Sequence, residues 1–259
     1  MINEFQVNIM NAGFDLDIDQ ENYVNPYSSY NVSNNENIIL DIYVPSIDHD
    51  QNICSFEFNT GNTYPNVNFA SIPFLEDFSS GMPCDWENSH SQIAYGNTPI
   101  SSGWTFGTAD SLEGAYWDIP DYGSFAVSND DLCNCDMFED RLISPPFDLD
   151  TLSGILNLSF DAFYTGDYGS SAFVDISLDG GDTWTEIYTL SGDIVWQTVN
   201  LDLSSFLGES IVQIAFRHSD SHLWASGFAI DNVILEVECI DTDNDGVCDI
   251  DEVIGCTDI

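Results

Sequence analysis

Apolar and polar residues alternate along several stretches in the middle of this chain. Each stretch places its apolar side chains on one face and its polar side chains on the other, which is the pattern of a β-strand with one face against a core. Turn-forming residues separate the stretches, and none of them keeps a helical period. The clearest are 156–163, 173–178, 196–201 and 212–216. They predict an all-β jelly-roll sandwich, with short helices only around 202–207 and 249–254.

The alternation changes character along the chain and divides it into three expected segments. Residues 1–71 hold shorter strand patterns, such as 5–9 and 38–44, broken by Asn, Ser, Gly and Pro. We interpret them as a partial immunoglobulin-like β-sandwich, because they are too few for a complete module. The aromatic-rich segment 72–238 holds the jelly roll, and 239–259 is a short acidic end.

The acidic end contains one twelve-residue stretch, 241–252, whose spacing predicts a calcium-binding loop. Such a loop needs oxygen ligands at positions 1, 3, 5, 7, 9 and 12 and a glycine at position 6, and Gly246 stands there. The predicted ligands are Asp241, Asp243, Asp245, the Val247 carbonyl, Asp249 and Glu252. The alternative is a solvated acidic tail. No helix pair flanks the loop, so we expect Ca²⁺ to stiffen a linker between modules rather than to open a sensor.

The charge balance excludes several classes of function. The chain has 45 acidic residues and two basic ones, Arg141 and Arg217, which gives a net charge of −43. Nucleic acid and anionic membrane surfaces are therefore not expected partners, and a kinase or ATPase would need a lysine that is absent. Self-repulsion on this scale indicates an environment rich in calcium or salt, such as the outside of a cell.

Seven cysteines leave at least one without a partner inside this sequence. We expect the polypeptide to continue into further domains and Cys256 to pair beyond the residues given. Cys239 and Cys248 could form a bridge across the acidic loop. Cys133 and Cys135 stand too close together to pair comfortably, which makes Cys84 a candidate partner for one of them.

Residues 177–184 read Ser-Leu-Asp-Gly-Gly-Asp-Thr-Trp and match the Asp-box pattern of a β-hairpin turn. The glycines permit the turn backbone, and the Asp179 carboxylate can accept hydrogen bonds from turn amides. Sialidases carry several such boxes and need three arginines, whereas this chain has one box and two arginines. The hairpin is expected to be structural.

Six motifs in one order resemble the cleaved-adhesin domains of gingipain-type bacterial surface proteins, which are relatives of the MAM and galactose-binding-like folds. They are 74–78, 85–86, 123–129, 140–148, the Asp box and 227–233. The resemblance implies a secreted or surface-attached, non-catalytic jelly-roll module that binds a protein or glycan on a host or neighbouring cell. Residues 239–258 resemble a thrombospondin type 3 calcium repeat.

The same resemblance implies a structural calcium where the first and last strands of the sandwich meet, held by Glu76 and Asp231. Two carboxylates brought together from distant parts of the chain would repel each other without a bridging cation. Groups near Asn129 and Asp130 could complete the ligand shell. The alternative is that Glu76 and Asp231 are ordinary carboxylates at strand ends.

Catalytic groups are scarce, and no enzyme activity is expected. The stretch His218-Ser-Asp-Ser-His222 lacks the helical frame of a zinc site and is interpreted as a turn.

Binding is the expected class of function. Trp86, Trp104, Tyr116 and Trp117 could form an aromatic platform for sugars, or could instead pin a long loop to the sandwich. Three hypotheses remain: a calcium-stabilised adhesion module, a structural spacer beside a catalytic domain, and a glycan-cleaving enzyme that uses two carboxylates.

Overall fold

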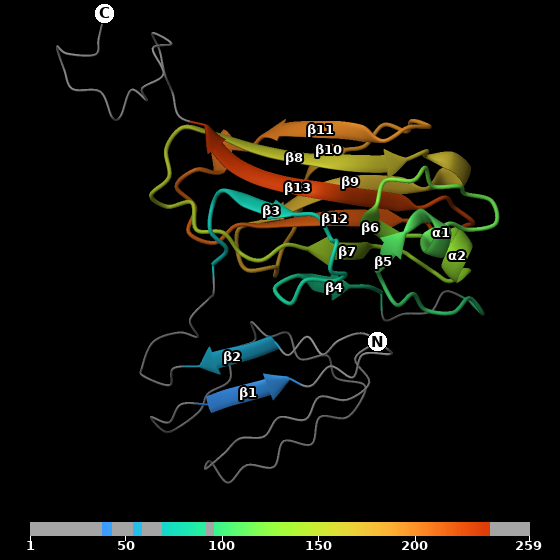
Figure 1. Cartoon of the computed structure of the whole chain (residues 1–259), viewed down its shortest axis with the longest axis horizontal. Helices are drawn as coiled ribbons and strands as arrows, with labels where there is room; N and C mark the ends of the chain where they lie inside the picture. The colour runs from blue at the N-terminus through green and yellow to red at the C-terminus, as the bar shows by residue number, and fades with distance from the viewer. Residues whose placement is uncertain (1–37, 43–53, 59–68, 92–95, 239–259) are drawn as a thin grey trace, which may run out of the picture. The chain divides into compact units, whose positions relative to one another are not determined.

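The computed structural model describes residues 38–42, 54–58, 69–91 and 96–238 (Figure 1). The chain divides into two compact units, Met1–Asn68 and Phe69–Ile259. In the first unit, β1 (Ile38–Ile42) and β2 (Cys54–Phe58) pair antiparallel. The predicted strand 5–9 and the calcium loop 241–252 lie outside the described residues.

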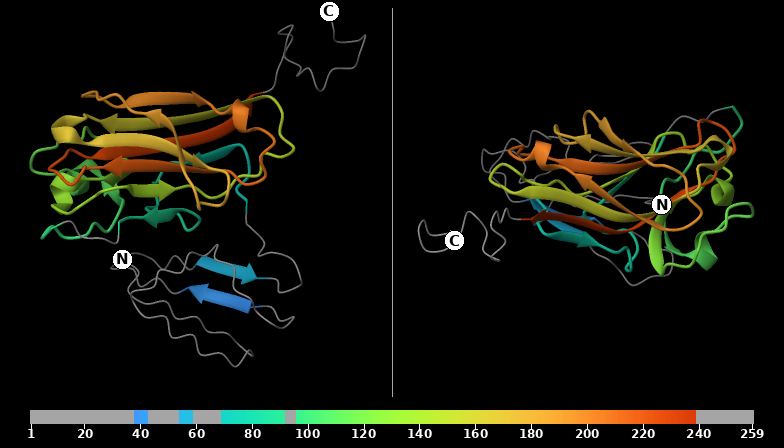
Figure 2. Two further views of the ribbon diagram at one scale, coloured as in Figure 1. Left: turned by 180° about the vertical axis from the view of Figure 1, so that it is seen from behind. Right: turned by 90° about the horizontal axis from the view of Figure 1, so that it is seen from above.

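The second unit is a sandwich of two antiparallel sheets, whose layers can be followed in Figures 1 and 2. The five-stranded sheet has the order β10 (Thr185–Thr189), β9 (Ser171–Ser177), β12 (Gln213–Ser219), β7 (Asp140–Ile143) and β4 (Glu87–Ser89). The six-stranded sheet has the order β11 (Gln197–Asp202), β8 (Ile155–Tyr164), β13 (Phe228–Glu238), β6 (Ser124–Ser128) and β5 (Thr105–Thr108), with β3 (Phe74–Glu76) also paired to β13. This arrangement confirms the predicted all-β sandwich of jelly-roll class.

The main core lies between the sheets and follows the alternation of the strands. Leu158 and Phe160 of β8 and Ile214 and Phe216 of β12 are fully or almost fully buried there. A second apolar cluster covers the outer face of the six-stranded sheet, where Phe163 and its neighbours meet the segment that follows β5. That segment begins with α1 (Ala109–Leu112) and is held on the sheet by its apolar side chains.

Helices are short in the part of the chain that the structure describes. Besides α1, they are α2 (Asp130–Cys133) and the 3₁₀ turns η1 (Asp167–Gly169) and η2 (Ser204–Phe206). The last of these lies inside the predicted 202–207 segment. None of the described helices is long and apolar enough to cross a membrane.

The Asp box forms the predicted hairpin turn between β9 and β10. Asp179 accepts hydrogen bonds from the Thr183 amide at 2.9 Å and from the Ser177 hydroxyl at 2.8 Å. Gly180 and Gly181 have φ of 78° and 92°, a backbone region that side chains disfavour. Polar groups of the turn itself supply these hydrogen bonds, which agrees with a structural role.

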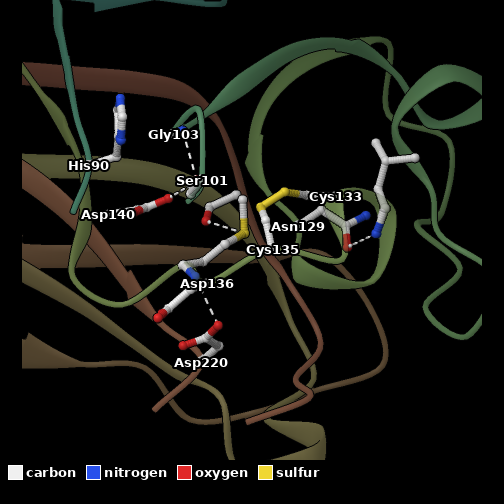
Figure 3. The surroundings of a disulfide bond; sticks show 12 residues. His90, Ser101, Gly103, Asn129, Cys133, Cys135, Asp136, Asp140 and Asp220 are labelled. Atoms are coloured by element: carbon white, nitrogen blue, oxygen red, sulfur yellow. Dashed lines mark hydrogen bonds between the residues drawn. A yellow bond between two sulfur atoms is a disulfide. The ribbon is translucent and has the colours of Figure 1, made fainter. Parts of the chain in front are cut away.

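The cysteine prediction is wrong for one pair. Cys133 and Cys135 form a disulfide with each other, with a Cα–Cα distance of 5.2 Å (Figure 3). The residue between them, Asn134, ends α2 in the left-handed conformation (φ 51°, ψ 47°), and this bend folds the two cysteines toward each other. Cys84 is also disulfide-bonded, but neither Cys133 nor Cys135 is its partner.

Candidate functional site

Three of the four aromatic residues predicted to form a sugar platform are buried. Trp86 packs edge-on against Phe78, Trp104 packs edge-on against Phe228, and Trp117 stacks on Phe163 at a centroid distance of 5.4 Å. A buried indole has no free face for a ligand, so these three do not form the platform. Trp117 instead pins the segment after α1 to the outer face of the sheet.

A different set of aromatic and apolar side chains is exposed at one end of the sandwich, the end that carries α1 and α2 in Figure 1. Trp224 is 77% exposed, Tyr116 75% and Tyr168 70%, and Leu223 beside Trp224 is also exposed. They come from the segment after α1, from η1 between β8 and β9, and from the loop between β12 and β13. We call these four residues the aromatic end.

Hydrogen bonds tie the three connections of the aromatic end together. In α2, Asp131 accepts from the backbone amides of Tyr116 at 2.5 Å and Trp117 at 3.1 Å. The neighbouring Asp130, which is buried, accepts from the amide of Ala225 at 2.8 Å.

The next residue along the loop, Ser226, donates from its amide and its hydroxyl to the Asp167 carbonyl at 3.4 and 3.3 Å. Hydrogen bonds therefore hold in place the backbone that carries the exposed rings.

Beneath the aromatic end lies a group of buried polar residues that links α2, β7 and the β12–β13 loop. Asp136 and Asp220 are almost completely buried, and His222 is partly buried. The His222 Nδ1 atom lies 3.0 Å from both carboxylate oxygens of Asp136. Asp220 accepts from the amides of Met137 and His222, both at 2.8 Å. We call Asp136, Asp220 and His222 the buried triad.

Two further buried aspartates flank the triad. Burial raises the pKa of Asp140 to about 7 and that of Asp130 to about 6, and the charges of Asp220 and Asp136 add to both increases. Asp140 accepts a 2.5 Å hydrogen bond from the Ser101 hydroxyl (Figure 3). On β12, burial lowers the pKa of His218 to about 4, and its Nδ1 lies 2.8 Å from the Ser128 hydroxyl. His218 lies in strand β12 rather than in the predicted turn, because it is buried against the sheet, and it does not share a site with His222.

Glu76 and Asp231, the predicted calcium ligands, lie on paired strands. Glu76 is opposite Val233 in the β3–β13 pair, and Asp231 precedes a β-bulge at Asn232, where φ is 49°. Burial raises the pKa of Asp231 to about 6, with further increases from Asp161, Asp77 and Glu76.

Among the described residues, the Asp231 Oδ1 atom is buried and accepts no hydrogen bond. An unpartnered carboxylate oxygen among like charges fits the oxygen ligands that calcium takes.

The two basic residues are both engaged elsewhere, in the five-stranded sheet. Arg217 donates to both oxygens of the buried Asp175, at 2.6 and 3.1 Å, and Arg141 reaches the same carboxylate at 3.2 Å. Glu139 and Glu186 complete the group. No arginine or lysine is therefore left to balance the aspartates beneath the aromatic end.

Sequence reasoning missed the exposure of Trp224 and Tyr168 and the burial of Asp136 and Asp220. One available signal was a tryptophan next to a leucine in the polar stretch between two strands, since apolar residues in such a loop need either a core or a partner.

Comparisons with known proteins give similarity in structure only. No family model and no curated protein matches the sequence. The K1 cleaved adhesin domain of Lys-gingipain from Porphyromonas gingivalis W83 is 19% identical, with a TM-score of 0.43 over 65% of this chain and 99% of that one.

Two other solved structures show the range of neighbours. The carbohydrate-binding module TmCBM61, solved with β-1,4-galactotriose, is 13% identical, with a TM-score of 0.39 over 62% of this chain and 94% of that one. The enzymatically active domain of tailspike protein 4 from bacteriophage CBA120 is 15% identical, with a TM-score of 0.40 over 66% of this chain and 22% of that one.

Proposed function

We propose that this chain is a non-catalytic binding module of a secreted or surface-attached protein, which binds a glycan or a protein through its aromatic end. The observation that carries the proposal is the exposure of Trp224, Tyr168 and Tyr116 on connections that buried hydrogen bonds hold in place. Exposed aromatic rings on fixed backbone bind at a low entropic cost, and aromatic residues dominate the energy of many interfaces.

Calcium is part of the proposal as a stabilising ion. The unpartnered Asp231 oxygen, with Glu76 and Asp77 near it, supports one site in the sandwich. The 241–252 loop, whose sequence predicts a second site, lies outside the described residues. A cation at Glu76 and Asp231 would join the first strand of the sandwich to the last.

The burial of the perturbed carboxyl groups favours binding over glycan cleavage. In the part of the chain that the structure describes, Asp140 is fully buried and Asp130 almost so, and a general acid must reach the bond that it protonates. The spacer hypothesis does not account for the exposed rings.

The test is a binding measurement on the full chain with glycan and matrix-protein arrays in calcium, followed by titration of the best ligand. Trp224→Ala should weaken binding by roughly 30-fold or more, as the loss of a central aromatic contact does. Tyr168→Ala should weaken it less, because a smaller ring is removed.

Leu75→Ala is the matched control, since Leu75 is exposed and apolar but lies on β3, outside the aromatic end. It should leave binding unchanged. Equal affinities of the Trp224→Ala variant and the unaltered chain would overturn the proposed site. Absence of any ligand on the arrays would favour the structural spacer.

A further inference from the structure

The buried triad brings three metal-binding side chains together. One ligand atom from each of Asp136, Asp220 and His222 lies within 4.8 Å of the other two. Metal bonds to nitrogen and carboxylate oxygen are about 2.0–2.2 Å long, which places the ligand atoms about 3.0–3.5 Å apart around one ion. The 3.0 Å distances between His222 Nδ1 and the Asp136 oxygens are already in that range. The Asp220 oxygen lies within 4.8 Å of the other two atoms and must move toward them for all three to bind one ion.

The three side chains are also held in orientation. The Phe138 amide donates to Asp136 at 3.2 Å, and the amides of Met137 and His222 fix both oxygens of Asp220. The His222 ring stacks on Phe138 at a centroid distance of 4.2 Å. Side chains held by their own surroundings lose little freedom when an ion binds.

The negative charge around these groups favours a bound cation in addition to the pairing of Asp136 with His222. Asp136 and Asp220 are 2% and 1% exposed, and Asp130 and Asp140 lie close enough for their charges to interact with them. Both arginines of the chain bind Asp175 instead. Buried carboxylates are normally paired or coordinate metals.

Asp140, which is fully buried, adds negative charge near the triad but is not one of the side chains whose ligand atoms come together. Its carboxylate accepts hydrogen bonds from the Ser101 hydroxyl and from the Ser91 backbone. Figure 3 shows Asp140, Asp136 and Asp220 on the same side of the Cys133–Cys135 disulfide.

We propose that Asp136, Asp220 and His222 form a site for a divalent transition-metal ion of the zinc class. The imidazole nitrogen favours such an ion over calcium, which takes oxygen ligands. The ion would fasten the β12–β13 loop to the segment that follows the disulfide, and so would hold Trp224, two residues after His222. This consequence for Trp224 rests on the proposed function, whereas the metal site itself does not.

The test is a zinc titration by calorimetry of the full chain, after removal of metals with a chelator and in excess calcium to fill the oxygen-only sites. One zinc ion should bind with a defined affinity. Asp136→Asn and His222→Gln should each weaken it by at least about tenfold. Asp148→Asn, an exposed aspartate, and His90→Gln, another histidine, should not change it.

A second measurement on the unaltered chain covers variants that fail to fold. With ¹⁵N-labelled histidine, zinc should shift the imidazole nitrogens of one of the four histidines, and the assigned residue should be His222. Shifts at other histidines only, or the same zinc affinity in every variant, would overturn the site.

The metal site and the proposed binding function can be tested independently of each other. If zinc binds but no ligand is found, the metal site stands and the proposed function fails. If the ligand binds through Trp224 but zinc does not bind the triad, the proposed function stands and the metal site fails.

Discussion

At the scale of single residues, the chain has to neutralise many buried carboxylates with only two basic side chains. Asp175 receives both arginines, while Asp140 receives a hydroxyl hydrogen bond from Ser101. A buried carboxyl group without a cation holds a proton more tightly, which is why the pKa of Asp140 rises. Buried carboxyl groups of this chain are therefore neutralised in two ways: by arginine at Asp175 and by a bound proton at Asp140.

The raised pKa of Asp140 predicts how stability depends on pH in a metal-free sample. Near pH 7 the folded chain binds a proton at Asp140 that the unfolded chain, with a pKa of 3.8, does not bind. The free energy of unfolding should therefore increase as the pH falls from 8 to 6.5. One such group contributes at most about 1.4 kcal/mol per pH unit.

Urea unfolding at several pH values with a chelator measures this slope. Asp140→Asn should flatten it, and the exposed Asp148→Asn should not. Asp130 and Asp231, with pKa values raised to about 6, also increase the free energy of unfolding as the pH falls, mainly near pH 6.5. Below about pH 6.5, His218 opposes them, because burial lowers its pKa to about 4 and its unfolded form takes up the proton first. A slope that Asp140→Asn leaves unchanged would contradict the assignment to Asp140.

At the scale of elements, the segment after α1 depends on a glycine far away in the sequence. A Cβ atom built on Gly227 would meet the Trp117 ring and the Ser128 carbonyl oxygen. Gly227→Ala should therefore displace Trp117 from Phe163 and lower the free energy of unfolding by about 1–3 kcal/mol, a usual cost of overpacking.

A double-mutant cycle with Trp117→Ala, measured by urea unfolding, checks the cause. In the Trp117→Ala background, Gly227→Ala should lower the free energy of unfolding by clearly less. Part of the loss should remain, because the added methyl group still meets the Ser128 carbonyl oxygen. The same cost in both backgrounds would mean that the tryptophan is not what the added methyl group meets.

Strands with a long alternating pattern could be predicted from the sequence, and short ones could not. The predicted stretch 156–163 lies within the ten-residue strand β8, because eight alternating residues are enough to show the period of two. β4 and β5 have three and four residues, which is too short to show any period. The Cys133–Cys135 pair was missed because it depends on the left-handed conformation of one residue, Asn134.

The candidate site was harder to predict than the fold. Tryptophans in an irregular segment look alike in sequence, yet Trp117 is buried because a glycine gives it room, while Trp224 has no such cover. Aspartates in polar loops look solvated, and only the three-dimensional packing shows that Asp136 and Asp220 are enclosed. By contrast, motif order predicted that Glu76 and Asp231 lie where the first and last strands meet, and β3 does pair with β13; their role as calcium ligands stays a prediction.

At the scale of the whole molecule, the net charge of −43 predicts a strong dependence on cations. In a chelator, sodium chloride should raise the melting temperature, because 0.15 M salt shortens the screening length to about 8 Å. Calcium should raise it further than sodium at equal ionic strength, since ions that bind only the folded chain add stability. At 100 times the dissociation constant the gain is about 2.7 kcal/mol for one site.

Thermal unfolding in calcium, magnesium and sodium chloride at one ionic strength separates binding from screening. Asp231→Asn should remove part of the calcium effect and none of the sodium effect. Equal melting temperatures in all three salts would show that screening alone acts, and would remove the support for calcium sites.

The pairing of the first strand of the sandwich with the last determines how this unit would respond to mechanical force. β3 begins opposite Leu235 and ends opposite Val233. The segment that leads into β3 and the segment that leaves β13 therefore lie at the same end of the strand pair. Tension on those segments would peel the strands apart one hydrogen bond at a time instead of shearing all of them at once. A cation shared by Glu76 and Asp231 would sit further along that pair, where it would arrest the peeling after the first contacts had opened.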